Sequence, residues 1–352
     1  MLLQLLPTNT PESTPSIQRG SFHGAGGTLL GMQIVNVCLT IVTLGAYHFW
    51  AKAKIRRYLF SQTAFAGDRF AYHGTGKELY QGFLKAMVVF GIPYFSLGAA
   101  HSFLALPQSV DFLLQAMAAL VLFLYVPVAI VNARRYRCTR TSWRGIRFSF
   151  RGRTVDFLKL YFKGWLFTLL TLGTYYPYFQ TQRQAFLHSH TYFGNQRFQF
   201  TGHGSGLMVP FAVTLFTTYA VRCLCGLALA LQLTNAGLTL LLIPFVLGPV
   251  WVWLLGQKQK YYWDHTTFGE ARFSSSITWQ KLFGLYLGNL ALLLLTLGWA
   301  WPWVTVRNAR FFIGTLSLQG LTDLDRVLQD TTETSVTGEG LSNLLDTGFD
   351  MD

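Results

Sequence analysis

Side chains that could do chemistry are gathered most densely in one stretch, GDRFAYHGTGKE, at residues 67–78. A Gly-x-Gly followed by lysine at the start of a helix can hold a phosphate through backbone N–H groups. The same letters also describe an ordinary turn, and GTGK lacks the preceding spacing of a phosphate-binding P-loop. Both interpretations stay open, and the polar residues to test first are Asp68, His73, Lys77 and Glu78.

A second candidate is a single arginine inside an apolar run. Arg222 lies deep in the run that contains TTYAVRCLCG, and ionisable residues at membrane depth are functional hypotheses by default. Snorkelling of the long side chain to the membrane surface is the alternative. The sequence therefore leaves Arg222 open between contact with an anionic solute or lipid headgroup and a purely structural role.

Patterns for metal binding and catalysis are weak. His23, His73 and His203 each adjoin a recurrent glycine, but a metal site would need three distant units to converge. The sequence has no Gly-x-Ser-x-Gly nucleophile elbow. The four cysteines are scattered in a way that predicts buried thiols. We expect no metal, no cofactor and no enzymatic activity.

The composition is that of a membrane protein, with 51% hydrophobic and 12% charged residues. Spanning a bilayer as a helix takes about 20 apolar residues. We expect a polytopic, all-α integral membrane protein with about seven hydrophobic segments, near residues 28–50, 79–104, 110–132, 157–179, 207–233, 237–256 and 279–304.

Three of these segments end in the same way. The triplet Thr-Leu-Gly begins at Thr43, Thr171 and Thr296, and aromatic residues follow each copy. Self-similarity at this spacing indicates internal repeats, near residues 22–78, 136–204 and 261–320. Glycine and proline together predict a break in each helix, at the positions Gly45, Gly173, Gly298, Pro177 and Pro302.

A second motif consists of an aromatic residue, a threonine, a glycine and then Arg-Phe. Its four copies contain Arg69, Arg147, Arg197 and Arg272, and Phe22–Gly24 and Phe311–Gly320 resemble partial copies. Alternating aromatic and polar residues bounded by glycine predict short extended hairpins. We expect these hairpins at the membrane surface, with the aromatic residues toward lipid and the arginines toward phosphate, acting either as simple anchors or as binding elements.

Charge predicts the sidedness of the chain. Loops at 96–112 and 231–238 contain no Lys or Arg, whereas the Arg-Phe segments are rich in them, so the Arg-Phe segments should face the cytoplasm. The same rule and anionic headgroups account for the net charge of +13 without nucleic acid. Two topologies remain open, namely seven full spans, or four spans plus three re-entrant helices broken at Thr-Leu-Gly.

The stretches NVCLTIVTLGAYHFWAKAKIRRYLFSQTAFAGDRFAYHGTGKEL and YRCTRTSWRGIRFSFRG resemble the YjgN family of bacterial inner-membrane proteins, a domain family of unknown function. The resemblance covers residues 21–320 and implies a multi-pass protein of the bacterial inner membrane. It brings no substrate or site residues. Outside it we expect a disordered lead at 1–20 and a disordered acidic tail at 321–352, with eight acidic residues and one basic residue from Asp323 onward.

The repeats, broken helices and intramembrane arginine together favour a transporter or channel-like protein for a small or anionic solute or a lipid. The alternative is a non-transporting membrane module that binds anionic lipid or a protein partner through the Arg-Phe hairpins. Both hypotheses make anionic membrane lipids the expected partners.

Overall fold

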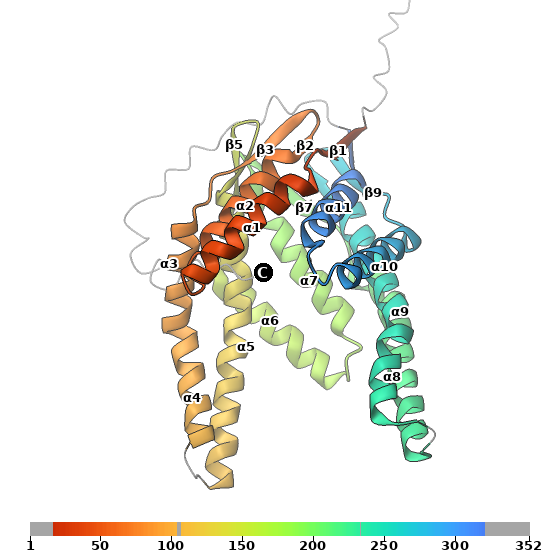
Figure 1. Cartoon of the computed structure of the whole chain (residues 1–352). Helices are drawn as coiled ribbons and strands as arrows, with labels where there is room; N and C mark the ends of the chain where they lie inside the picture. Colours follow the sequence, from red (N-terminus) through yellow and green to blue (C-terminus); the bar gives the residue numbers. More distant parts are fainter. Residues whose placement is uncertain (1–16, 104–106, 233, 321–352) are drawn as a thin grey trace, which may run out of the picture.

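The chain is built from five pairs of helices, and a computed structural model describes residues 17–103, 107–232 and 234–320. Each of the first four pairs is followed by two short strands and the fifth by one strand, while one further strand precedes the first pair (Figure 1). The pairs are α1 (Gly26–Val42) with α2 (His48–Gln62); α3 (Gly76–Ala86), η1 (Met87–Gly91) and α4 (Ile92–Phe103) with α5 (Gln108–Thr139); α6 (Thr154–Leu170) with α7 (Tyr176–Ser189); η2 (Gly204–Leu207) and α8 (Met208–Ala230) with α9 (Ala236–Asp264); and α10 (Trp279–Leu295) with α11 (Trp301–Gly314).

The strands form one closed antiparallel barrel in the order β1-β10-β9-β8-β7-β6-β5-β4-β3-β2. This barrel shows that the prediction of an all-α fold is wrong. The extended hairpins are present as expected, but each joins its neighbours edge to edge. The strands are β1 (Gln18–Phe22), β2 (Thr63–Phe65), β3 (Asp68–Tyr72), β4 (Thr141–Trp143), β5 (Ile146–Phe150), β6 (Thr191–Phe193), β7 (Gln196–Phe200), β8 (Thr266–Phe268), β9 (Ala271–Ser275) and β10 (Leu316–Gln319).

Strands from the two ends of the described chain complete the barrel. The first strand, β1, pairs with the last, β10, with Gln18 opposite Leu318 and Arg19 opposite Ser317. On its other side β1 pairs with β2, with Gly20 opposite Phe65. The two partial motif copies at 22–24 and 311–320 therefore belong to one hairpin, whose halves lie at opposite ends of the described chain. Closure leaves none of the ten strands with a free edge.

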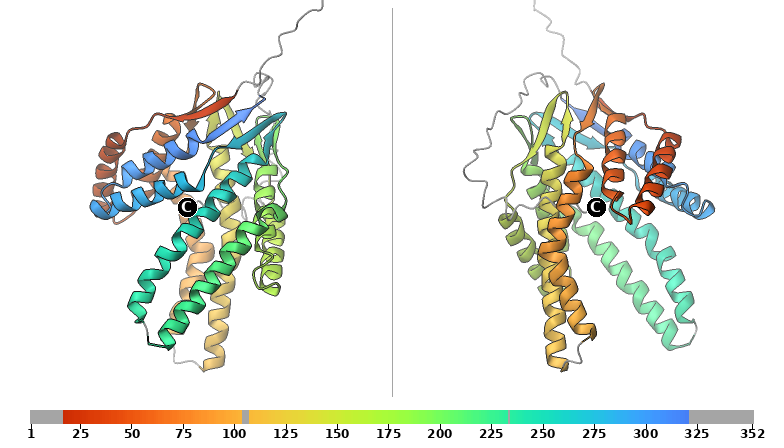
Figure 2. Two further views of the ribbon diagram at one scale, coloured as in Figure 1. Left: turned by 90° about the vertical axis from the view of Figure 1, so that its right-hand side faces the viewer. Right: turned by 60° about the vertical axis from the view of Figure 1, so that its left-hand side comes forward.

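Long and short helix pairs alternate along the chain. Four helices are long and apolar enough to cross a bilayer: Gly76–Ser102, Gln108–Thr139, Gly204–Ala230 and Gly237–Asp264. They form the two long pairs, which extend from one end of the barrel (Figures 1 and 2). The three pairs that contain Thr-Leu-Gly are shorter, and each returns the chain to the barrel.

This arrangement favours one of the two topologies. Seven full spans would place consecutive hairpins on opposite membrane faces, but all five hairpins belong to one barrel. The described part of the chain therefore contains four candidate spans and three short pairs that enter and leave on the barrel side. The positive-inside rule predicts that this side is cytoplasmic.

Each short pair reverses at its Thr-Leu-Gly triplet through two successive left-handed residues. At the first turn, Leu44 and Gly45 have φ angles of 49° and 93°, and the other two turns repeat these values closely. The Thr43 hydroxyl donates to the Leu39 carbonyl (2.7 Å) and accepts from the Tyr47 backbone N–H (2.9 Å). Threonine thus ends one helix and supports the start of the next.

Candidate binding chamber inside the barrel

Aromatic side chains fill the inside of the barrel. Strand pairing places Phe70 opposite Trp143, Phe148 opposite Phe193, and Phe198 opposite Phe268. The ring centroids of Phe148 and Phe193 are 4.8 Å apart, within the range of favourable aromatic contacts. Pairing and side-chain alternation along each strand put eight aromatic residues in one inward layer, namely Phe65, Phe70, Trp143, Phe148, Phe193, Phe198, Phe268 and Phe273.

This layer overturns the expected orientation of the hairpins. Trp143, Phe193 and Phe268 are 5%, 2% and 7% exposed and form one buried cluster. They cannot face lipid. A two-residue period identifies which residues share a face, but it does not say whether that face meets lipid or the inside of a barrel.

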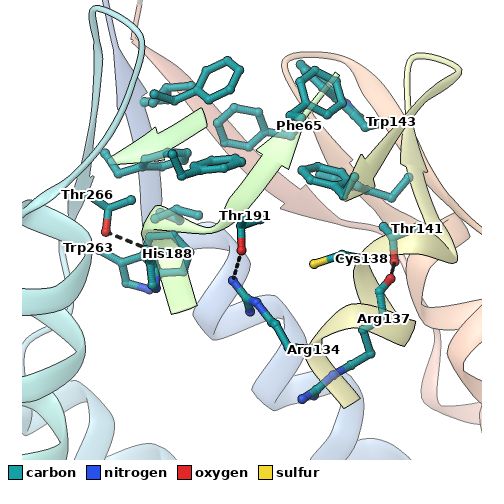
Figure 3. A pocket seen from close by; sticks show the side chains of 18 of the residues that line it. Phe65, Arg134, Arg137, Cys138, Thr141, Trp143, His188, Thr191, Trp263 and Thr266 are labelled. Carbon is teal, nitrogen blue, oxygen red and sulfur yellow. Dashed lines mark hydrogen bonds between the residues drawn. The ribbon is translucent and has the colours of Figure 1, made fainter. Parts of the chain in front are cut away.

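A cavity of about 440 Å³ lies within the barrel between the aromatic layer and the adjoining helix ends. Figure 3 shows the aromatic side chains on one side of this chamber and the polar ones on the other. The polar side is formed by Thr141, Thr191 and Thr266 from the strands, by His188 from α7, and by Arg134 and Arg137 from α5. The chamber is large enough for a small organic molecule.

The threonines of the repeated motif have a local structural role. The hydroxyls of Thr141, Thr191 and Thr266 donate to the carbonyl four residues earlier, at 2.8, 2.7 and 2.6 Å. Each thereby satisfies a carbonyl in the last turn of a helix, at the point where the helix becomes a strand. Their remaining lone pairs can accept hydrogen bonds inside the chamber.

Among the cations at the polar side of the chamber, Arg134 is held by a hydrogen bond to a strand residue. Its Nη2 donates to the Thr191 hydroxyl at 3.4 Å, whereas its buried Nε has no hydrogen-bond partner. Arg137 lies one turn further along α5 and is exposed. None of the described residues that line the chamber is Asp or Glu. The chamber therefore combines an apolar wall with cationic hydrogen-bond donors, an arrangement that suits an anion.

His188 is buried beside Arg134 and stays neutral. Burial, and then the nearby charge of Arg134, lower the pKa of His188 to about 4. The Thr266 hydroxyl already donates to a backbone carbonyl, so the 3.4 Å contact to His188 Nδ1 requires that nitrogen to carry the proton. His188 Nε2 then accepts from the Gln184 side-chain amide at 2.7 Å. This hydrogen-bond pattern sets the tautomer.

The arginines expected at phosphate lie on the outer wall of the barrel. Arg69, Arg147, Arg197 and Arg272 are all exposed. A fifth, Arg19, occupies the same position in the hairpin formed by the chain ends. The sequence QRGSF at 18–22 is similar to QRFQF at 196–200. Gly20 stands where the four motif copies have phenylalanine, so the Arg-Phe pattern is not recognisable there.

The polar cluster of the first repeat joins two neighbouring repeats. Asp68 pairs with Arg144 of the next hairpin, and His73 Nε2 lies 2.8 Å from the Ser142 hydroxyl. Lys77 is exposed on the first turn of α3. None of these residues lines the barrel chamber.

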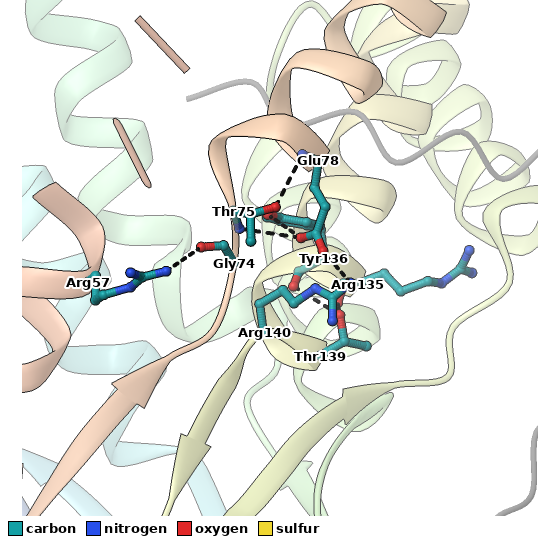
Figure 4. A network of polar contacts seen from close by, with 8 residues as sticks. All are labelled: Arg57, Gly74, Thr75, Glu78, Arg135, Tyr136, Thr139 and Arg140. Carbon is teal, nitrogen blue, oxygen red and sulfur yellow. Dashed lines mark hydrogen bonds and ion pairs between the residues drawn. The ribbon is translucent and has the colours of Figure 1, made fainter. Parts of the chain in front are cut away.

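Glu78 joins the start of α3 to the end of α5 (Figure 4). Its carboxylate accepts from Arg140 at 2.8 Å and from the Tyr136 hydroxyl at 3.0 Å. It also forms a capping box with Thr75 at the start of α3. These contacts position the first long span against the second.

The Gly-x-Gly before α3 is shaped by packing. A Cβ at Gly76 would lie 2.5 Å from the Trp50 ring and 2.6 Å from its Cα. Gly26 and Gly204 meet Trp303 and Tyr178 in the same way, and these three aromatic residues each lie seven positions after a Thr-Leu-Gly threonine. The geometry favours the turn interpretation of GTGK over a phosphate site.

Arg222 lies on α8, where it is exposed, and it lines neither the barrel chamber nor a second cavity between α1 and α10–α11. Within the described part of the chain, no group of three or more His, Cys, Asp or Glu residues is arranged to hold a metal ion.

Sequence reasoning missed Arg134, Arg137 and His188. In the sequence these residues belong to the basic helix ends that precede each hairpin. The positive-inside rule already accounted for basic residues there, so they did not stand out as a binding site. Only the convergence of α5, α7 and α9 on the barrel brings these side chains into one chamber.

These features define a class: a multi-pass membrane protein in which helix pairs are joined by hairpins into a closed barrel at one end. A sequence profile described as "Bacterial protein of unknown function (DUF898)" matches residues 17–344, and the chain belongs to this family. Similar curated proteins are the "Inner membrane protein YjgN" of Escherichia coli O157:H7, 35% identical over 130 residues, and that of Salmonella typhimurium LT2, 33% identical over 131 residues. These matches cover 37% of this chain and 30% of each relative.

No solved structure matches the chain. The family and the four apolar spans confirm the expected resemblance and the expected location, a bacterial inner membrane.

Proposed function

We propose that this protein binds a small amphiphilic organic anion in the barrel chamber and carries it between the bilayer and the cytoplasmic face. The supporting observation is the chamber itself, where an aromatic wall faces Arg134 and Arg137. The apolar body of the ligand lies among the rings. Its anionic group accepts hydrogen bonds from the guanidinium groups. The proposal contains no covalent step, in keeping with the expectation that the protein is not an enzyme.

The position of the chamber supports membrane access. Its polar side is built from the ends of α5 and α7, at the level where the spans meet the barrel (Figures 1 and 3). A ligand that partitions into the cytoplasmic leaflet reaches this level with its charged group in the interface. Transport then requires only that the ligand leave the chamber on the cytoplasmic side.

Binding can be tested with 8-anilinonaphthalene-1-sulfonate, an aromatic anion whose fluorescence rises in apolar sites. The purified protein in lipid nanodiscs should bind this probe with energy transfer from tryptophan, because Trp143 and Trp263 line the chamber. Arg134→Gln should weaken binding by about tenfold or more, since a hydrogen bond to a charged group contributes about 1.5–3 kcal/mol.

Two controls separate recognition of the negative charge from nonspecific hydrophobic binding of the probe. The neutral analogue N-phenyl-1-naphthylamine should bind wild type and Arg134→Gln about equally. Arg222→Gln and Arg153→Gln remove exposed arginines that do not line the chamber and should leave probe binding unchanged. Equal probe affinity in wild type and Arg134→Gln would remove the chamber as the anion site.

The transport step needs its own measurement. Proteoliposomes should release the same anion from their membrane into the medium on the barrel side faster than empty liposomes, and Arg134→Gln should reduce that rate. Binding without faster transfer would retain the anion site and eliminate transport.

A further inference from the structure

The outer wall of the barrel carries one exposed arginine from each of the five hairpins. Arg19, Arg69, Arg147, Arg197 and Arg272 occupy equivalent strand positions. We call this set the arginine ring. Closure of the barrel puts the five residues at one height, because each hairpin repeats the same register. Arg197 Nε additionally donates to the Ser189 carbonyl.

The arginine ring lies toward the hairpin turns and away from the bilayer. Arg69 is the second residue of β3 after its turn, whereas Tyr72 at the other end leads toward α3. Three residues of strand correspond to roughly 10 Å, which exceeds the Debye length of about 8 Å at physiological ionic strength. Lipid headgroups at the span ends are therefore a poor electrostatic match for this ring.

Among the described residues, acidic side chains are few on the barrel wall. In the described strands and turns of the barrel, the acidic residues are Asp68 and Glu270, and Asp68 pairs with Arg144. The described strands and turns thus carry six arginines against these two acidic residues.

The chain supplies a segment of opposite charge at the same height. β10 ends at Gln319, which pairs with Arg272, and Ser317 pairs with Arg19. The segment 321–352, outside the described residues, therefore starts between two members of the arginine ring. From Asp323 onward it contains eight acidic residues and one basic residue.

The lengths also agree. Ten strands spaced about 4.8 Å apart give a barrel circumference of roughly 50 Å. The 32 residues of the segment 321–352 can span up to roughly 100 Å when extended. The segment is long enough to reach Arg147 on β5, on the opposite side of the barrel from β10 in the strand order.

We propose that the acidic C-terminal segment of this chain docks on the arginine ring and covers the outer wall of the barrel. Exposed ion pairs are individually weak. Covalent attachment raises the effective concentration of the segment to the millimolar range, so that several weak pairs act together. Docking is screened by salt. It does not depend on what the barrel chamber binds.

The docked state can be measured by electron–electron distance spectroscopy in the full chain. Nitroxides at Ser149→Cys on β5 and Ser342→Cys in the tail, in a background without the four native cysteines, should show a short, narrow distance component. This component should disappear when the eight tail carboxylates are changed to amides, and also at high salt. Identical distributions for the charged and the neutral tail would overturn the proposal.

A second experiment assigns the contact to the arginine ring. A fluorescent peptide with the sequence of 321–352 is titrated onto the full chain that carries the neutral tail. Changing the five arginines to glutamine should weaken peptide binding about tenfold or more. Changing them to lysine, which retains the charge, should preserve most of the binding. Undiminished binding to the glutamine variant would overturn the proposal.

The same variants identify the competing occupant. If the ring held lipid headgroups, native mass spectrometry would show phosphatidylglycerol lost from the glutamine variant while the peptide failed to bind the neutral-tail protein. That pair of results would replace the tail with lipid and overturn the proposal. Binding of the peptide with unchanged lipid content supports it.

Discussion

At the scale of single residues, His188 makes the stability of the folded protein depend on pH. Its ring is 8% exposed and lies in α7, outside the four candidate spans. Burial beside Arg134 lowers the pKa of His188 to about 4 in the folded protein, whereas an unfolded chain protonates histidine near pH 6.5. Between these two pH values the unfolded state binds more protons. The free energy of unfolding therefore falls as the pH falls through this window.

We expect wild type to lose about 3 kcal/mol of stability between pH 6.5 and pH 4 through this one group. His188→Gln, which stays uncharged, should show a shallower decline of the apparent melting temperature over the same range. Melting curves in nanodiscs, followed by tryptophan fluorescence, make this comparison. Parallel pH profiles for the two proteins would mean that His188 is protonated in the folded state.

At the scale of elements, the short helix pairs differ from the long ones in where they end. Pair α6–α7 reverses at Thr171–Gly173 and returns to the barrel at Ser189, although the hydrophobic run at 157–179 predicted a possible full span. The reversal places both ends of this pair on one membrane face. A helix that ends at mid-depth relies on neighbouring protein or water for its free backbone groups.

Cysteine labelling tests this topology directly. Ser189→Cys, in a background without native cysteines, should react with a membrane-impermeant maleimide only from the cytoplasmic side. Reaction from the periplasmic side would require α6 to cross the membrane. The control position is Ser102→Cys at the far end of the first long pair, which should label from the periplasm.

At the scale of the whole molecule, the barrel makes the two ends of the described chain into one structural unit. β1 and β10 are separated by nearly the whole sequence, yet they complete the fifth hairpin. Loop closure over that distance is entropically costly, so the pairing depends on the other four hairpins being in place. The barrel then holds the five helix pairs in a fixed order.

A cross-link should report this closure. Arg19→Cys and Ser317→Cys face each other across the β1–β10 ladder and should form a disulfide on mild oxidation, because directly opposite strand residues lie within disulfide range. Oxidation should change the electrophoretic mobility of the intact chain. Ser21→Cys with Ser317→Cys is the matched control that is out of register, and equal cross-linking of both pairs would argue against the barrel.

Much of the architecture could be predicted from particular residues. Thr43, Thr171 and Thr296 mark the reversals, and Arg69 with its equivalents marks the hairpins. Both signals are local, since a turn or an alternating strand depends on residues a few positions apart. The clustering of polar side chains at 67–78 was equally visible, but their partners Arg144, Ser142 and Arg140 belong to the next repeat.

By itself the sequence determined that this is a multi-pass membrane protein made of repeats, because hydrophobic length and local periodicity are properties of short windows. Only the tertiary structure decided that the hairpins close into a barrel, that their aromatic residues point inward, and that Arg134 and His188 share a chamber. Strand pairing between hairpins joins residues 41 or more positions apart, from Phe150 with Thr191 to Phe70 with Trp143. Each hairpin carries the same pattern whether it lies on lipid or on its neighbour, and burial of the aromatic faces together selects the barrel.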